Sequence, residues 1–110
     1  MASELNQSCI EALKNCIEAC EQCAEACRSE GSPVHMQRCI ALDTDCAEFC
    51  RLALKFLQRE SEFTPLIIED CAEICRECGD ECEKHQPEHC KRCAQACHFC
   101  MEECLRVISR

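Results

Sequence analysis

The chain of 110 residues has only two glycines and three prolines, and it has no long run of apolar residues. Because glycine and proline interrupt helices and build loops, their scarcity argues against a loop-rich fold and favours long helices. The absence of an eighteen-residue apolar run excludes a membrane-spanning helix. The first fifteen residues, MASELNQSCIEALKN, lack the basic start and apolar stretch of a secretory signal. We therefore expect a cytoplasmic protein with no membrane partner.

Basic residues are also in the minority. Twelve Lys and Arg stand against 21 Asp and Glu, which gives a formal net charge of −9. A chain with this charge is a poor ligand for nucleic acids, so no nucleic-acid partner is expected. The acidic residues are spread along the chain instead of forming a tail, which indicates a solvated outer face.

Cysteine is the residue present in excess, at 17 of 110 positions. Cys16 to Cys27 and Cys71 to Cys82 both follow the spacing 4, 3, 4, and Cys90 to Cys104 follows 3, 4, 3, 4. An α-helix turns once in about 3.6 residues, so each run lies on one helix face. At this density, cysteine indicates either secreted disulfides or a metal site, and a cytoplasmic location favours the metal.

Four helices are expected in a single domain that spans residues 1–110. The first is expected to begin at about Ser3, and the start signals of the other three are the pairs Ser32-Pro33 and Thr64-Pro65, each a cap with a first-turn proline, and Gln86-Pro87. The expected helices run from these signals to about Cys27, Arg59, Lys84 and Ile108, with Gly31 as a stop signal after the first. Short connections predict antiparallel neighbours, hence an all-α, up-down-up-down four-helix bundle with a Cys-lined core.

All seventeen cysteines fall on the inward-facing positions of these helices, called the seam below. The seam residues, in chain order, are Cys9, Leu13, Cys16, Cys20, Cys23, Cys27, Met36, Cys39, Asp43, Cys46, Cys50, Ala53, Leu57, Ile68, Cys71, Cys75, Cys78, Cys82, Cys90, Cys93, Cys97, Cys100, Cys104 and Val107. A bundle normally fills such positions with Leu and Ile. Free cysteine packs as a small hydrophobe, but that property accounts for two or three residues and not for seventeen.

The two ends of the expected bundle differ in chemistry. One end carries His35, Met36, His85 and His89 beside cysteines, and we expect it to be the entrance, here called the mouth. The opposite end is expected to be apolar and closed. It gathers Leu5, Leu54, Phe56, Leu57, Phe63, Leu66, Ile67, Ile68, Leu105, Val107 and Ile108.

The spacing suits a soft, two-coordinate ion. Cysteines at i and i+4 have Cβ atoms about 5–6 Å apart, too far for an unstrained disulfide. Thiolate and thioether ligands select Cu(I), and one Cu(I) per bridging thiolate leaves the core neutral, at a capacity of about 17 ions per chain. One Zn(II) with four thiolates leaves a charge of −2 per site, and burying that charge is costly.

Three other functions are weighed against Cu(I) storage and detoxification. A disulfide-stapled helical protein would oxidise its cysteine pairs across helices, but one of the seventeen would be left over. A Zn(II)-thiolate store needs tetrahedral quartets. An iron–sulfur protein usually presents Cys-x-x-Cys-x-x-Cys on a loop, a spacing that the runs do not have. No pairing of nucleophile and base suggests an enzyme.

The Cys-x-x-x-Cys-x-x-Cys-x-x-x-Cys runs at Cys16 to Cys27 and Cys71 to Cys82, with the longer run at Cys90 to Cys104, resemble the bacterial copper storage proteins. The lack of a leader resembles the cytosolic branch of that family. The resemblance covers nearly the whole chain. It implies a four-helix bundle that loads many Cu(I) ions along its interior, exchanges them with a copper donor or acceptor protein and assembles as a homotetramer. It also implies that the seam cysteines are the ligands, with His35, Met36, His85 and His89 at the mouth.

Some residues have more than one interpretation. Asp43 interrupts the cysteines of the second helix, where it caps a copper site, accepts a hydrogen bond from a thiol or turns to solvent. His98 lies off the seam, which favours a surface or subunit-contact role. A further group flanks the seam and packs between helices or forms a self-association patch. Its members are Ile10, Ile17, Phe49, Ile74 and Phe99.

Overall fold

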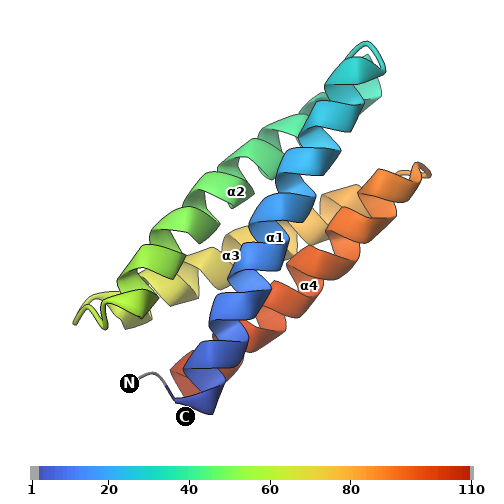
Figure 1. The fold of residues 1–110 in the computed structure, drawn as a ribbon. Helices are drawn as coiled ribbons and strands as arrows, with labels where there is room; N and C mark the ends of the chain where they lie inside the picture. The colour runs from blue at the N-terminus through green and yellow to red at the C-terminus, as the bar shows by residue number, and fades with distance from the viewer. Residues whose placement is uncertain (1–2, 110) are drawn as a thin grey trace.

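The computed structural model describes residues 3–109 and confirms the all-α four-helix bundle (Figure 1). The helices are α1 (Glu4–Ser29), α2 (Gln37–Gln58), α3 (Thr64–Glu83) and α4 (Glu88–Ser109), and a 3₁₀ turn, η1 (Val34–Met36), precedes α2. The bundle is a rod of 44 × 17 × 17 Å. None of the helices in residues 3–109 is long and apolar enough to cross a membrane.

Neighbouring helices run antiparallel, as predicted. The α1–α2 and α3–α4 connections lie together at one end of the rod, and the α2–α3 connection lies with the two chain termini at the other (Figure 1). Helices that follow one another in the chain pack together, and α4 packs back against α1, which closes the ring. The connections between helices therefore place the predicted mouth at a single end.

The helix starts agree with the sequence only in part. Ser3 caps α1, since its side chain accepts a hydrogen bond from the Asn6 backbone N–H. The prediction of Ser32 as a cap is wrong, because Ser32 has φ of 48° and its N–H instead binds the Cys27 carbonyl at the end of α1. Pro33 consequently leads into η1, and α2 begins only at Gln37.

Thr64 is not a cap either. It is the first residue of α3, and its hydroxyl donates to the carbonyls of Phe56 and Ser61 across the α2–α3 connection. Pro65 occupies the first turn as predicted, where its missing N–H costs no hydrogen bond. The helix boundary is thus set by hydrogen bonds to the preceding helix instead of by a side-chain cap.

The predicted seam is confirmed along all four helices. Every cysteine is fully buried, and the remaining seam residues are buried with them. Leu57, Ile68 and Val107 close the end opposite the mouth, as expected. Phe63 and Leu66, assigned to the same closed end, instead project into solvent, with 58% and 60% of their surfaces exposed. That end is therefore closed by fewer apolar side chains than the sequence suggested.

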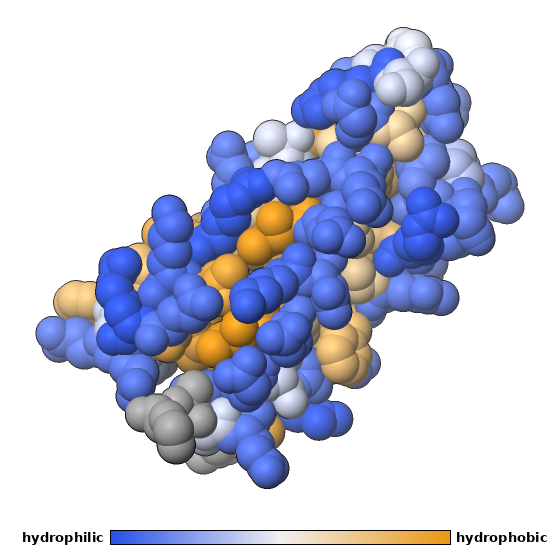
Figure 2. Space-filling view, in the orientation of Figure 1, coloured by the Kyte–Doolittle hydropathy of each residue, from blue (hydrophilic) through white to orange (hydrophobic). Residues whose placement is uncertain are grey.

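The outer surface is mainly hydrophilic, with a strip of hydrophobic residues along the long axis of one face (Figure 2).

The residues predicted to flank the seam divide into three groups by their exposure. Ile10 is buried in the core, Ile17, Phe49 and Ile74 pack partly buried against it, and Phe99 is 52% exposed.

Candidate metal centre

The helices direct seventeen thiols into one continuous column at the centre of the bundle. All seventeen are free and fully buried. Neighbouring sulfur atoms lie between 3.3 Å (Cys39 and Cys82) and 4.0 Å (Cys16 and Cys20) apart. A disulfide has its sulfurs about 2.05 Å apart, so these thiols are in contact but not bonded.

The sulfur contacts cross between helices as well as along them. Cys16 on α1 has its Sγ 3.8 Å from that of Cys46 on α2 and 3.7 Å from that of Cys97 on α4. The Sγ of Cys50 on α2 lies 3.7 Å from the Sγ atoms of both Cys71 and Cys75 on α3. Each central thiol therefore faces several others, as a thiolate that bridges two metal ions requires.

The sulfur separations suit a metal–thiolate lattice. Two bonds of about 2.2–2.3 Å to one ion place the sulfurs about 4.5 Å apart, by analogy with zinc–sulfur bonds. The observed contacts of 3.6–4.0 Å in the centre of the column approach that value, and rotation about χ1 supplies the difference. Several sets of four ligands also have all their atoms within 4.8 Å of one another, including Cys16, Cys46, Cys50 and Cys75.

Asp43 lies inside the thiol column and is fully buried. Its Oδ1 accepts hydrogen bonds from the thiols of Cys78 and Cys93, both at 3.2 Å, and of Cys82 at 3.4 Å. Of the interpretations that the sequence left open, the solvent-facing one is wrong and the thiol acceptor is observed. Burial in the column raises the pKa of Asp43 to about 8.

Burial also alters the acidity of thiols near the mouth. Desolvation raises the pKa of Cys90 to about 12 and raises that of Cys27 above its usual value. Cys39 differs, because hydrogen bonds from Cys23 and Cys82 to its sulfur lower its pKa to about 3. Metal uptake at Cys90 and Cys27 must therefore displace a proton.

Of the mouth histidines, His89 lies against the thiol column. Its Nδ1 atom is 3.4 Å from the sulfur of Cys23 and 3.6 Å from that of Cys90. Its other ring nitrogen, Nε2, is 3.2 Å from a carboxylate oxygen of Glu30. The imidazole thus lies between the thiols inside and a carboxylate outside.

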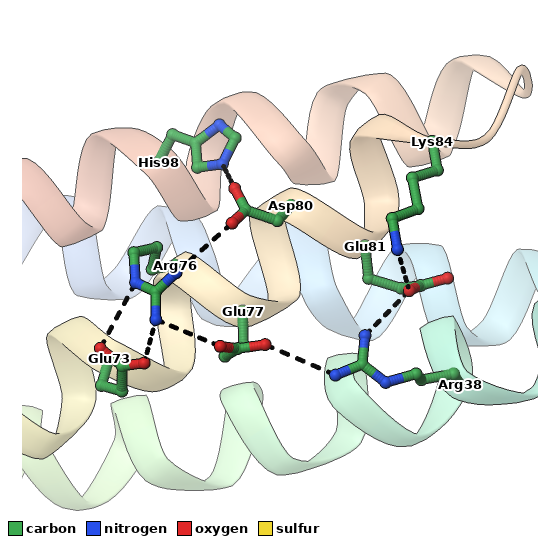
Figure 3. A network of polar contacts seen from close by, with 8 residues as sticks. All are labelled: Arg38, Glu73, Arg76, Glu77, Asp80, Glu81, Lys84 and His98. Carbon is green, nitrogen blue, oxygen red and sulfur yellow. Dashed lines mark hydrogen bonds and ion pairs between the residues drawn. The ribbon is translucent and has the colours of Figure 1, made fainter.

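His85 is held in the wall of the mouth. Its Nε2 is 2.9 Å from Glu81, whose carboxylate also accepts from Arg38 at 2.9 Å and from Lys84 at 3.4 Å. Figure 3 shows Glu81 between Arg38 and Lys84 in a chain of ion pairs along the outer side of α3. Burial alone would raise the pKa of Glu81, but these hydrogen bonds hold it below its usual value.

The other two predicted mouth residues, His35 and Met36, differ in their burial. His35 is exposed, and its ring centroid is 6.1 Å from that of His85. Met36 is buried at the start of α2. The structure therefore brings all four residues to one end, at different depths.

His98 lies between α3 and α4, away from the thiols. Its Nε2 is 2.9 Å from Oδ1 of Asp80 (Figure 3). Its ring also lies against Gly79, so close that a β-carbon on residue 79 would be 2.5 Å from the ring. The predicted surface location is confirmed in part, since the side chain is 27% exposed.

The sequence missed the carboxylates that hold the mouth histidines. Acidic residues were assigned to a solvated face, yet Glu81 and Glu103 are buried, at 6% and 4% exposure. The i, i+4 spacing of Glu81 and His85 could have indicated their contact. No local spacing predicts Glu30 with His89, because these residues meet only when α1 packs against α4.

Comparison with known proteins gives the same fold and the same cysteine-rich character. A family model described as Csp, copper storage protein, matches residues 2–109. The uncharacterized cysteine-rich protein YhjQ of Bacillus subtilis (strain 168) is 44% identical over 101 residues, which cover 92% of this chain and 94% of YhjQ.

Solved structures are similarly close. The Cu(I)-bound copper storage protein BsCsp3 of Bacillus subtilis is 42% identical, with a TM-score of 0.89 over 97% of this chain and 100% of that one. A cytosolic copper storage protein from Streptomyces lividans, loaded with five coppers, is 36% identical, with a TM-score of 0.93 over 97% of this chain and 94% of that one. The chain therefore belongs to the copper storage protein family.

Proposed function

We propose that this protein stores and detoxifies Cu(I) in the cytoplasm, without catalysing a reaction. The observation that carries the proposal is the continuous column of seventeen free, fully buried thiols. Soft thiolate ligands select Cu(I), and a column of thiols in mutual contact provides bridging positions along its whole length. All seventeen cysteines are proposed as ligands.

Charge sets the expected capacity. If each thiolate bridges two ions and each ion binds two thiolates, ions and thiolates are equal in number, at about 17 Cu(I) per chain. The buried core then carries no net charge beyond that of Asp43, which avoids the cost of desolvating many charges. Asp43 is proposed as a hydrogen-bond acceptor and occasional ligand within the column.

The relatives support the metal and the location. One is described as Cu(I)-bound, one as a cytosolic protein loaded with five coppers and one from Streptomyces lividans as loaded with ten copper equivalents. Multiple loading of that kind fits a store better than a single-ion carrier. We propose that a copper donor or acceptor protein exchanges Cu(I) with the column at the mouth.

A Zn(II)-thiolate store is the second candidate, because the column contains sets of four ligand atoms that lie within 4.8 Å of one another. Tetrahedral zinc needs such quartets. Several of these quartets share members, however, so they cannot all be filled at once: Cys16 and Cys46 belong to two of them. Each filled quartet would also bury a charge of −2, so Cu(I) fits the column better.

Two finer features belong to the same proposal. His35, Met36, His85 and His89 are proposed as mouth ligands that receive copper from solution.

A homotetramer is proposed for the assembly, and the exposed apolar side chains of Phe99 and Leu52 support self-association. Analytical ultracentrifugation of the reduced protein tests the assembly, and a monomer at micromolar concentration would contradict it.

The central experiment is an anaerobic titration of the fully reduced protein with Cu(I), followed by metal and thiol analysis of the desalted product. We expect about 17 Cu(I) per chain and no loss of thiols to disulfide. A parallel titration with Zn(II) should saturate at about four ions, and added Cu(I) should displace them. Saturation by four or fewer Cu(I) would refute the storage proposal.

A further inference from the structure

The imidazole of His89 connects the thiol column to the surface. Nδ1 is directed inward, 3.4 Å from Cys23 Sγ and 3.6 Å from Cys90 Sγ, and those two sulfurs lie 3.9 Å apart. Nε2 is directed outward, 3.2 and 3.4 Å from the two carboxylate oxygens of Glu30. The ring itself is nearly buried, with 12% of the side chain exposed.

The outer contact decides which nitrogen carries the proton. An ionised carboxylate only accepts hydrogen bonds, so Glu30 fixes the proton of a neutral imidazole on Nε2. The lone pair is then on Nδ1, the nitrogen that faces the two thiols. A histidine that binds a metal usually donates its other N–H to a carboxylate in this way, which orients the ring and makes it a stronger ligand.

The fold provides this contact by bringing two distant segments together. Glu30 is the C-cap residue of α1, and its backbone N–H binds carbonyls of the last helical turn, which fixes its position. His89 lies in the first turn of α4. Because Cys23 is on α1 and Cys90 is on α4, the Glu30–His89 contact spans the same two helices as the thiol pair.

His85 provides a contrast within the same mouth. Its Nε2 also meets a carboxylate, that of Glu81, but Glu81 is buried and shared with Arg38 and Lys84 in the outer network of Figure 3. In residues 3–109, no thiol is in hydrogen-bond contact with His85, whereas His89 has two such neighbours. The two histidines are therefore not equivalent.

We propose that Glu30 is a positioning residue for copper uptake: its carboxylate holds His89 with Nδ1 directed at Cys23 and Cys90, so that the three atoms receive an incoming Cu(I). Glu81 holds His85 in the wall of the mouth, where within residues 3–109 its ring contacts no thiol, so His85 lies outside this three-atom set. This inference rests on the proposed storage function and names the residue that prepares its mouth for the ion. Uptake then transfers the ion from these three atoms to the thiols deeper in the column.

The test compares the rate of Cu(I) uptake from a chromophoric Cu(I) chelate in the wild type and in single variants. Glu30→Ala should slow the first phase by about tenfold, the lower end of the effect of losing a metal ligand's partner. Glu30→Gln keeps an acceptor oxygen and should recover most of the rate. Glu18→Ala removes the same charge from an exposed position on α1 and should leave the rate unchanged.

A double-variant cycle separates positioning from general electrostatic attraction. In a His89→Ala background, Glu30→Ala should have no further effect, because the ring that it positions is absent. Nitrogen-15 NMR of histidine-labelled apo protein should show the His89 proton on Nε2 in the wild type and a mixture of tautomers in Glu30→Ala. Circular dichroism of each variant checks that the bundle is intact.

The outcomes distinguish this inference from the storage proposal. A wild-type protein that saturates at four or fewer Cu(I) refutes storage. Two results would refute the positioning role alone, provided that the wild type fills normally. One is that Glu30→Ala takes up Cu(I) as fast as the wild type. The other is that Glu30→Ala lowers the uptake rate by the same factor in the presence and in the absence of His89.

Discussion

The ring of His98 occupies the space in which a side chain of residue 79 would lie, because a β-carbon on Gly79 would be 2.5 Å from Cδ2 of His98. Asp80 holds the ring there through Nε2. The contact between the ring and residue 79 accounts for a glycine in the middle of a helix, where glycine otherwise costs about 0.5–1 kcal/mol relative to alanine.

Gly79→Ala should therefore destabilise the wild-type protein but stabilise a His98→Ala variant. In the wild type the new methyl group displaces the ring and breaks its contact with Asp80. Without the ring, the higher helix propensity of alanine should add about 0.5–1 kcal/mol to the free energy of unfolding. Chemical denaturation of the four proteins measures the cycle, and equal effects of Gly79→Ala in both backgrounds would contradict it.

Replacement of Asp43 by Asn should change how the stability of the apo protein depends on pH. The pKa of Asp43 is raised to about 8 in the fold, so the folded state favours the protonated carboxyl. Stability from this group is complete below the unfolded pKa of about 4 and is lost as pH rises toward 8. Between pH 5 and pH 8 the loss should be a few kcal/mol in the wild type and should be absent in Asp43→Asn.

Thermal melts of apo protein at several pH values measure this difference. The difference between the two proteins reports the ionisation of Asp43 together with its effect on the three thiols that donate to it. Parallel curves for wild type and Asp43→Asn would show that the buried carboxylate does not titrate in this range.

Copper capacity should depend on where in the column a thiol is removed. The sulfur of Cys97 lies 3.6–3.9 Å from those of Cys16, Cys20 and Cys93, whereas within residues 3–109 the sulfur of Cys9 contacts that of Cys104 alone, at 3.9 Å. If the central Cys97 thiolate bridges two ions and the Cys9 thiolate at the end of the column binds one, Cys97→Ser should lose about two Cu(I) and Cys9→Ser about one. Metal analysis of saturated, desalted protein measures both, and equal losses would contradict this difference between central and terminal thiolates.

Copper loading should release protons and weaken at low pH. Cys90 and Cys27 have raised pKa values, so they are protonated thiols at neutral pH and must lose a proton to bind Cu(I). We expect fewer than one proton per Cu(I) in an unbuffered titration at pH 7, because hydrogen bonds from neighbouring thiols lower the pKa values of part of the column, namely Cys16, Cys39, Cys46, Cys71 and Cys93. An apparent Cu(I) affinity that is the same at pH 6 and pH 8 would contradict this expectation.

Removal of copper should leave the bundle folded but less stable. The apolar residues Leu13, Leu57 and Ile68 are buried beside the thiols, and their packing stabilises the bundle independently of metal ligation. Each ion that binds only the folded state adds about 4 kcal/mol when free Cu(I) is a thousand times its dissociation constant. Chelated protein should therefore keep its helical circular dichroism and melt at a lower temperature, and loss of helix on chelation would show that metal is required for folding.

The sequence determined the helices and the contents of the core. The spacing of cysteines in steps of three, four and seven fits one helical face, so Cys16 and Cys97 could be assigned to the core before any packing was known. The short connections likewise determined the antiparallel order and placed His35 and His89 at one end. These features follow from helical geometry, which depends only on positions along the chain.

Only the tertiary structure decided which groups meet between helices. Ser32 and Thr64 are residue types that often cap helices, but neither caps a helix here. Ser32 binds the end of α1 through its backbone N–H, and the hydroxyl of Thr64 binds the carbonyl of Phe56, so these contacts override the local preference. The partners of Asp43 on α3 and α4, the ring of His98 over Gly79, and Glu30 behind His89 join residues 19 to 59 positions apart. Such pairs depend on the rotation and offset of one helix against another, and helical periodicity gives the face of a residue but neither of these quantities.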